Sequence, residues 1–214
     1  MNYILNSLRF ASFFHFKVLM LAASFQSMGD TIATTLYHLA KNPTKQELAF
    51  KSTLICESEL TNHYIRNCWY ETLRLTPTIP FSTRKIHEPF HLEQYHIPSN
   101  VYLMYFKHAV GENTNTFGNN ALEFIPERFD EIGLAETIKM YSPFGYGKRK
   151  CIGERFGEFA SVLLIKRLLK SFEFFVDAEL EEGKVEVLNT CASVGTKPNN
   201  LEILKWKIRN NQIE

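Results

Sequence analysis

The chain has 214 residues, 45% of them hydrophobic, and its 24 lysine and arginine side chains nearly balance 23 aspartates and glutamates. This balance argues against a dedicated nucleic-acid surface, which needs clustered basic side chains to neutralise phosphates. The 18 phenylalanines and the apolar fraction are sufficient for a sizeable core. The cysteines are widely spaced and form no Cys-x-x-Cys pair, which argues against a disulfide framework and a structural zinc site. They are Cys56, Cys68, Cys151 and Cys191.

Residues 8–28 form an apolar stretch rich in phenylalanine, leucine and alanine. Four polar or charged residues interrupt it: Arg9, His15, Lys17 and Gln26. A membrane-spanning helix needs about 20 largely apolar residues, and no small-residue cleavage site of a signal peptide follows the stretch. We therefore expect a long buried helix that continues past Asp30, with a membrane anchor as the alternative.

The helical pattern continues to residue 75 and is interrupted once, at Asn42-Pro43-Thr44. Pro43 ends one helix, and Thr44 is placed to cap the next one with Glu47 in a capping box. We expect this next helix over residues 45–59 and another over 61–75, which ends before the prolines that follow.

The middle of the chain, residues 81–104, has the pattern of short strands. Residues 95–103 predict a strand, a turn and a second strand, with Asn100 accepting a positive φ in the turn. Residues 105–150 are expected to be mostly irregular, and so long a coil is typical of a functional or cofactor-wrapping segment. A helix is expected over 152–172, followed by short strands between 174 and 208.

The segment from Pro143 to Gly153 carries the most chemical information. Gly145 and Gly147 let the backbone lie flat against a large planar ligand, because neither has a Cβ. Cys151 stands at the start of a helix, where unpaired N–H groups favour a negative charge on sulfur. The basic residues Lys148, Arg149 and Lys150 act in the same direction, and Arg149 can pair with a carboxylate. The inward face of that helix is expected to carry Ile152, Phe156, Phe159, Ala160, Leu163 and Leu164.

The segment alone is also compatible with a simple glycine-rich turn before an amphipathic helix. It resembles, however, the haem-binding signature of the cytochrome P450 family, Phe-x-x-Gly-x-Arg-x-Cys-x-Gly. The matching positions are Phe144, Gly147, Arg149, Cys151 and Gly153. The resemblance implies haem b as the cofactor, with Cys151 as the axial thiolate ligand and Gly145 beside the ring.

Further segments resemble other motifs of the family in the same order. Glu71-Thr72-Leu73-Arg74 resembles its Glu-x-x-Arg element, and Pro126-Glu127-Arg128-Phe129 resembles the element whose arginine joins that pair. Glu71, Arg74 and Arg128 are therefore expected to be structural and to position the ligand loop. Arg84 matches a position that pairs with a haem propionate, with a solvated surface arginine as the alternative.

Ser27-Met28-Gly29-Asp30-Thr31 resembles the acid–threonine element of the helix on the oxygen-binding side. The resemblance implies that Asp30 and Thr31 are catalytic and deliver protons, and that the Thr31 hydroxyl loosens the helix by bonding to the carbonyl four residues back. Met28 stands where the family has a small residue, and it crowds the oxygen side unless the register shifts to use Gly29.

The resemblance implies a mainly α fold with small β-sheets, the C-terminal portion of the cytochrome P450 fold, and incomplete. Residues 1–214 then form one partial domain, with a distal helix from about residue 12, a ligand loop at 143–153, and a helix and strands to residue 208. The implied activity is a monooxygenase that inserts one oxygen atom from O2 into a small apolar substrate, with electrons from an NADPH-dependent reductase. The implied location is the endoplasmic reticulum membrane, through an N-terminal anchor that this chain lacks. The alternative is a catalytically inactive remnant or an incomplete gene model.

Overall fold

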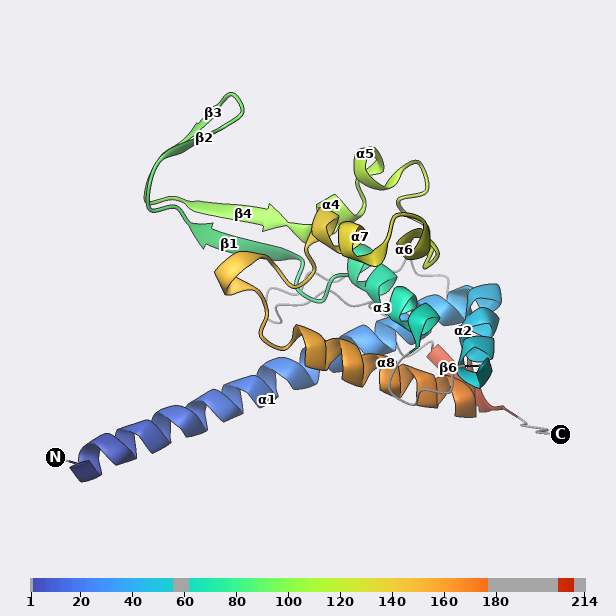
Figure 1. The fold of residues 1–214 in the computed structure, drawn as a ribbon. Helices are drawn as coiled ribbons and strands as arrows, with labels where there is room; N and C mark the ends of the chain where they lie inside the picture. Colours follow the sequence, from blue (N-terminus) through green and yellow to red (C-terminus); the bar gives the residue numbers. More distant parts are fainter. Residues whose placement is uncertain (1, 56–61, 177–203, 210–214) are drawn as a thin grey trace.

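A computed structural model of the chain describes residues 2–55, 62–176 and 204–209, with side chains from residue 17 onward except residue 19. The described chain is mainly helical, with three two-stranded antiparallel sheets (Figure 1). This agrees with the expected fold class.

The helix α1 (Asn2–Lys41) extends well beyond the rest of the molecule at its N-terminal end (Figure 1). Its second part is buried through Ile32, Leu36 and Leu39, whose spacing of four and three residues places them on one face. The described side chains before residue 30 are largely exposed, and Phe25 is 85% exposed. The expectation of a helix buried along its length is therefore wrong for its first part. Among the helices of the described residues, none is both long and apolar enough to cross a membrane.

The helices α2 (Pro43–Ile55) and α3 (His63–Leu75) follow. Because α2 begins at Pro43 itself, the predicted cap at Thr44 is wrong; proline suits the first helical position, where its missing N–H would have no partner. The cap of α3 is Asn62, whose side chain accepts a hydrogen bond from the Ile65 amide at 2.9 Å. Residues 56–59 of the predicted helix lie outside the described residues.

The strand β1 (Phe81–Lys85) pairs with β4 (Tyr102–Phe106), and β2 (Phe90–Leu92) pairs with β3 (Tyr95–Ile97). Asn100 has a φ of 63°, as its position in a turn predicts. The two strands on either side of Asn100 do not pair with each other, since β3 returns to β2 and β4 to β1.

Residues 105–150 contain more regular structure than expected. They form α4 (Lys107–Gly111), α5 (Thr114–Phe117), α6 (Arg128–Glu131), α7 (Leu134–Tyr141) and the 3-10 turn η1 (Gly147–Arg149). Most of these pieces are too short to repeat a hydrophobic face, so periodicity cannot reveal them.

The helix α8 (Glu154–Ser171) leads into β5 (Phe172–Val176), which pairs with β6 (Leu204–Ile208). The predicted inward face of α8 is wrong. Val162, Ile165 and Leu169 are buried, whereas four of the six predicted residues are exposed, namely Ile152, Phe156, Phe159 and Leu164. The core lies where α1, α3 and α8 meet (Figure 1). Cys191 and the predicted strands between 177 and 203 lie outside the described residues.

Candidate functional site

The loop before α8 is a closed turn that presents the thiol of Cys151 to solvent. Its backbone is held by three hydrogen bonds, from the Gly145 amide to Ser142 O (2.9 Å), from Lys150 to Gly147 O (3.0 Å) and from Cys151 to Phe144 O (2.9 Å). Gly145 and Gly147 have φ values of 76° and 68°, a region that side chains with a Cβ rarely adopt. The two glycines therefore give the loop its shape.

Two contacts attach the start of this loop to the core. The Phe144 ring stacks on Trp69 of α3, with centroids 5.7 Å apart. The buried ammonium of Lys107, at the start of α4, donates to Pro143 O at 3.0 Å. Burial lowers the pKa of Lys107; the nearby Cys151 opposes this shift and Arg84 adds to it. A buried lysine thus lies beneath the loop that carries the cysteine.

Cationic side chains lie on the loop and beside Gly145. A Cβ placed on Gly145 would lie 3.9 Å from Nη2 of Arg84, so this exposed guanidinium borders the loop. Arg149 is exposed as well, whereas the Lys150 ammonium pairs with Glu154 at 2.5 Å. Arg84 and Arg149 can therefore receive carboxylates of a ligand lying against the loop.

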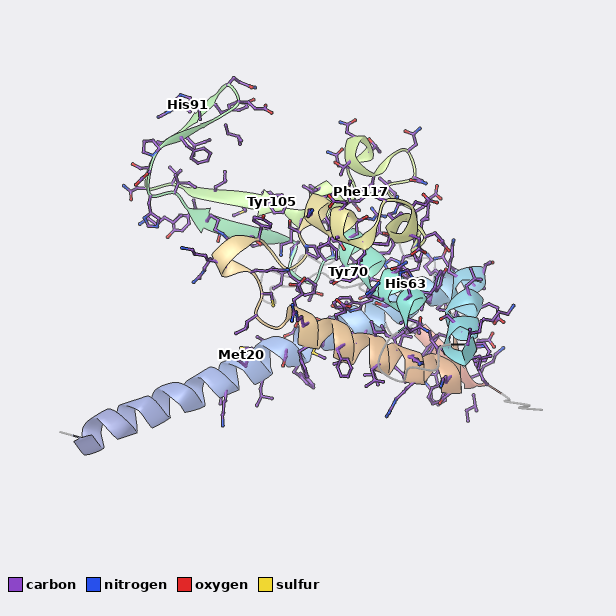
Figure 2. All side chains as sticks on the ribbon, in the orientation of Figure 1. Met20, His63, Tyr70, His91, Tyr105 and Phe117 are labelled. Carbon is purple, nitrogen blue, oxygen red and sulfur yellow. The ribbon has the colours of Figure 1, made fainter. Side chains whose placement is uncertain are left out.

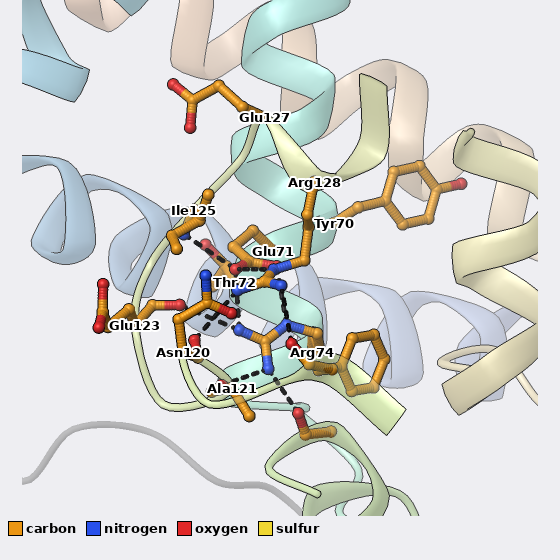
Figure 3. A network of polar contacts seen from close by, with 12 residues as sticks. Tyr70, Glu71, Thr72, Arg74, Asn120, Ala121, Glu123, Ile125, Glu127 and Arg128 are labelled. Carbon is orange, nitrogen blue, oxygen red and sulfur yellow. Dashed lines mark hydrogen bonds and ion pairs between the residues drawn. The ribbon is translucent and has the colours of Figure 1, made fainter. Parts of the chain in front are cut away.

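Glu71, Arg74 and Arg128 form one buried network (Figure 3). The carboxylate of Glu71 accepts from Arg74 Nε and Nη2, both at 2.8 Å, and from Arg128 Nε at 2.9 Å. It also accepts from the Ile125 amide at 2.9 Å. The network joins α3 to the segment before α6, which are more than 50 residues apart in the sequence.

Arg74 uses all five of its N–H donors. Besides Glu71, it donates to the carbonyls of Gly111, Ala121 (2.6 Å) and Glu123 (3.0 Å). A buried guanidinium is stable only when such donors are satisfied. Toward the start of α3, Trp69 stacks on Phe144 of the cysteine loop, and the Tyr70 carbonyl accepts at 2.9 Å from the hydroxyl of Tyr141, the last residue of α7. One helix therefore connects the network to the cysteine loop.

On α1, the Thr31 hydroxyl donates to Ser27 O at 2.7 Å, the carbonyl four residues back. It lies 2.6 Å from the hydroxyl of Thr78, in the turn between α3 and β1, and both residues are buried. Thr78 is a residue that sequence reasoning missed; its only signal is a hydroxyl between two prolines. Asp30 is partly exposed, and its carbonyl accepts from Thr34.

The helix remains regular around Thr31. The expected loosening of its hydrogen bonding does not interrupt α1, which continues from residue 2 to residue 41. A register shift to Gly29 also has no support, because successive residues of an α-helix turn by about 100°. Gly29 is exposed and points away from the buried face of Thr31.

A cavity of about 450 Å³ lies between α3 and α8, which begins three residues after Cys151. Its polar lining includes His63, Arg66, Arg155 and Glu158. Nε of Arg66 is buried and makes no hydrogen bond within the described part of the chain. The Tyr70 hydroxyl donates to Glu158 at 2.7 Å, and burial together with this bond raises the pKa of Tyr70. Sequence reasoning missed this cavity, since its residues follow no motif.

A family model described as Cytochrome P450 matches residues 15–204. The chain belongs to the cytochrome P450 family. Members of this family carry haem with a thiolate ligand and receive electrons from redox partner proteins.

Three relatives illustrate the similarity. The chain is 29% identical to "Probable cytochrome P450 12b2, mitochondrial" of Drosophila melanogaster, over 83% of this chain and 37% of the relative. It is 31% identical to "1,25-dihydroxyvitamin D(3) 24-hydroxylase, mitochondrial" of Mus musculus, over 64% of this chain and 28% of the relative. It is 28% identical to "Sterol 26-hydroxylase, mitochondrial" of Oryctolagus cuniculus, over 86% and 37%. The chain spans about a third of the length of these relatives.

These names correct the expected location. All three relatives are named as mitochondrial proteins, which contradicts an endoplasmic reticulum membrane. The expectation came from the family as a whole, because the residues of the cysteine loop carry no information about the compartment.

Proposed function

We propose that this chain binds haem b through the thiolate of Cys151 and forms the haem-ligand part of a monooxygenase. The observation that carries the proposal is the loop geometry: two glycines with positive φ and an exposed thiol at one end. An exposed thiol gives iron direct access to sulfur, and the absence of a Cβ on Gly145 and Gly147 leaves room for a flat ring.

The residues around the loop fit the cofactor. The carboxylates of haem need cations, and the guanidinium of Arg84 borders Gly145 while Arg149 is exposed on the same loop. Phe144 sits on Trp69 and offers an apolar edge behind the loop. Glu71, Arg74 and Arg128 act on this site through α3, as a positioning network.

The cofactor, once bound, supplies oxygen activation and insertion of one oxygen atom into an apolar substrate. The chain supplies ligation and proton delivery. Thr31 and Thr78 form a pair of hydroxyls 2.6 Å apart, each able to donate and to accept, so a proton can pass between them. Asp30 precedes Thr31 on α1, is partly exposed, and is the proposed source of the proton.

Electrons reach such a site from a partner protein, and we place the partner over the cavity between α3 and α8. Arg66 and Arg155 line this cavity, and Arg155 is close to Cys151 in the sequence. An acidic surface of the partner protein would complement these two positive charges. An NADPH-dependent reductase can feed this site directly or through a small ferredoxin, as in mitochondrial relatives. We also propose a mitochondrial location, because the three relatives are named as mitochondrial proteins.

The substrate is proposed to be a small apolar molecule. Two relatives are named for hydroxylation of a sterol and of 1,25-dihydroxyvitamin D(3). Both are largely apolar compounds, and an apolar substrate is the corresponding proposal for this chain.

Haem titration into the full chain tests the proposal. The dithionite-reduced complex with carbon monoxide should show the Soret band of a thiolate-ligated haem. Cys151→His should bind haem and lose that band, because imidazole replaces sulfur as the ligand. Cys68→Ala is the thiol control and should keep it, since Cys68 is buried away from solvent. Absence of haem uptake by the wild-type chain, or a band unchanged in Cys151→His, contradicts the proposal.

A second candidate is haem binding without turnover. The observation that favours it is the exposed first part of α1, where Leu21 and Phe25 have no cover among the described residues. Turnover needs an enclosed oxygen side that excludes water. Under this candidate the chain shows the thiolate band, yet substrate hydroxylation stays at background with either electron donor. Product formation that is lost in Thr31→Val would exclude it.

A further inference from the structure

The β2–β3 hairpin carries two histidines that nothing in the haem chemistry uses. His91 on β2 lies directly opposite His96 on β3. Both are exposed, and the hairpin forms an arm that projects from the helices, with His91 labelled on it (Figure 2).

The backbone fixes this pairing. Leu92 and Tyr95 pair on either side of a two-residue loop. The first residue of this loop, Glu93, has a φ of 51°. A positive φ at the first loop position is typical of the tight two-residue turns of β-hairpins, which set the strand register. Directly opposite residues point to one face, with Cβ atoms about 4.5–5.5 Å apart. The two imidazoles are therefore held together by the hairpin itself.

The ring separation matches joint ligation of one metal ion. Imidazole nitrogen binds zinc at about 2.1 Å and lies about 1.1 Å from its ring centre, so each ring centre is about 3.2 Å from the metal. For ligand angles between about 90° and 109°, the two centres are then about 4.5–5.2 Å apart. The centroids of His91 and His96 are 4.8 Å apart.

Local charge also favours a cation. Residues 86–106 contain two glutamates, Glu88 and Glu93, and neither lysine nor arginine. Because the arm is exposed to solvent, an ion that binds there loses little of its hydration energy. No group of three histidine, cysteine or acidic side chains capable of holding a metal occurs among the described residues, so water would complete the coordination.

We propose that His91 and His96 form a two-imidazole site for a divalent ion of borderline softness, and that the bound ion is Zn²⁺. Imidazole suits Zn²⁺ and Cu²⁺ better than Mg²⁺ or Ca²⁺, which prefer oxygen. The site does not depend on haem. The bound ion clips β2 to β3 and stabilises the hairpin, since it binds only the paired form.

The test is a titration of the full chain with Zn²⁺ alone, followed by NMR of the imidazole C–H signals. Histidine signals separate this site from zinc bound at the exposed Cys151 thiol. The signals of His91 and His96 should shift together at one equivalent, while Mg²⁺ leaves them unchanged. His91→Asn and His96→Asn should each weaken binding by at least about tenfold, because the second imidazole acts at high effective concentration. His87→Asn, in the segment before β2, is the matched control and should bind as the wild type does.

A register variant excludes an effect of histidine content. His96→Asn combined with Ile97→His keeps seven histidines but moves one imidazole to the opposite face of the hairpin. It should bind as weakly as His96→Asn alone. Unchanged affinity in this variant, or in both single variants, overturns the proposal. Hydrogen exchange of the Ile97 amide should slow with Zn²⁺ in the wild type, and equal slowing in His91→Asn also overturns it.

Discussion

At the scale of single residues, the chemistry of the cysteine loop depends on a few side chains with distinct tasks. Gly145 and Gly147 shape the turn, Cys151 ends it, and Lys107 holds its first residue from below. The first three are visible in the sequence because a local pattern encodes a local turn. Lys107 is not, because its partner Pro143 lies 36 residues away and only the fold brings them together.

Replacing Lys107 tests whether the buried ammonium positions the loop. Lys107→Met keeps the length of the side chain but removes the bond to the Pro143 carbonyl. A hydrogen bond to a charged group contributes about 1.5 kcal/mol, which is about tenfold in a local opening equilibrium. Hydrogen exchange of the Cys151 amide should therefore quicken by about tenfold. Lys139→Met, which removes only an exposed pair with Glu136, should leave that exchange unchanged. Equal exchange in Lys107→Met and wild type contradicts the positioning role.

At the scale of elements, α3 connects the parts of the candidate site. Its residues 69–74 contact the cysteine loop through Trp69 and the segment before α6 through Glu71 and Arg74. A buried network of one acid and two arginines adds little net stability by itself, but losing one partner leaves an uncompensated charge. Its value to the molecule lies in fixed geometry.

Glu71→Gln should destabilise the fold strongly. The substitution keeps the shape of the side chain and leaves two buried guanidinium groups without a counter-charge. We expect a loss of about 3–5 kcal/mol in the free energy of unfolding, measured by urea denaturation. The matched control is Glu136→Gln, at an exposed pair, with a loss below about 1 kcal/mol. A similar loss in both variants would show that the network is not a buried charge cluster.

The junction of α1 with α3 makes stability depend on pH. Nε2 of His38 lies 3.2 Å from the hydroxyl of Thr76, and its ring stacks on Phe124 with centroids 4.9 Å apart. Burial, reinforced by Lys41 and Arg74, lowers the pKa of His38 to about 4. The unfolded chain, with a histidine pKa near about 6.5, takes up a proton that the folded chain does not. The contribution of His38 is therefore complete above pH about 6.5 and is lost as the pH falls toward 4.

Urea unfolding between pH 7.5 and 4.5 measures this contribution. Each unit of difference in pKa corresponds to about 1.4 kcal/mol, so His38 should account for about 2–3 kcal/mol of the loss over that interval. His38→Gln should be less stable at neutral pH and should show a flatter pH dependence. His63→Gln, at an exposed histidine beside Asp130, should keep the wild-type slope. A wild-type slope in His38→Gln would contradict the assignment.

Some elements of this fold follow from local sequence patterns, and others depend on contacts between distant residues. The helices at 43–55, 63–75 and 154–171 and the strands around Asn100 were predictable, because period and turn residues are local signals. Strand pairing was not, since β4 finds β1 across the intervening hairpin. The buried face of α8 was misassigned because apolar residues occur on both of its sides. The sequence pattern therefore does not distinguish the buried Ile165 from the exposed Phe156. Thr78 and Arg66 are single polar residues whose role arises only from their neighbours in space.

At the scale of the whole molecule, a substantial apolar surface has no cover among the described residues. Phe25 on α1, Ile152 just before α8 and Phe156 on α8 are each more than 60% exposed. Exposed apolar patches of this kind mark surfaces that bind other protein, or promote association. The sites that carry stability lie elsewhere, at Ile165 and Leu169, which are fully buried.

Because exposed and buried apolar residues lie on different faces of α8, replacing one of each by serine should affect stability very differently. Phe156→Ser removes exposed apolar surface, so it should leave the unfolding free energy within about 0.5 kcal/mol of the wild type. It should also reduce self-association of the chain, measured by light scattering as a function of concentration. Ile165→Ser buries a hydroxyl and opens a cavity, with an expected loss of about 3 kcal/mol or more. If Phe156→Ser instead unfolds the chain as Ile165→Ser does, then Phe156 belongs to the core, and the face of α8 predicted from its sequence would be the one that carries stability.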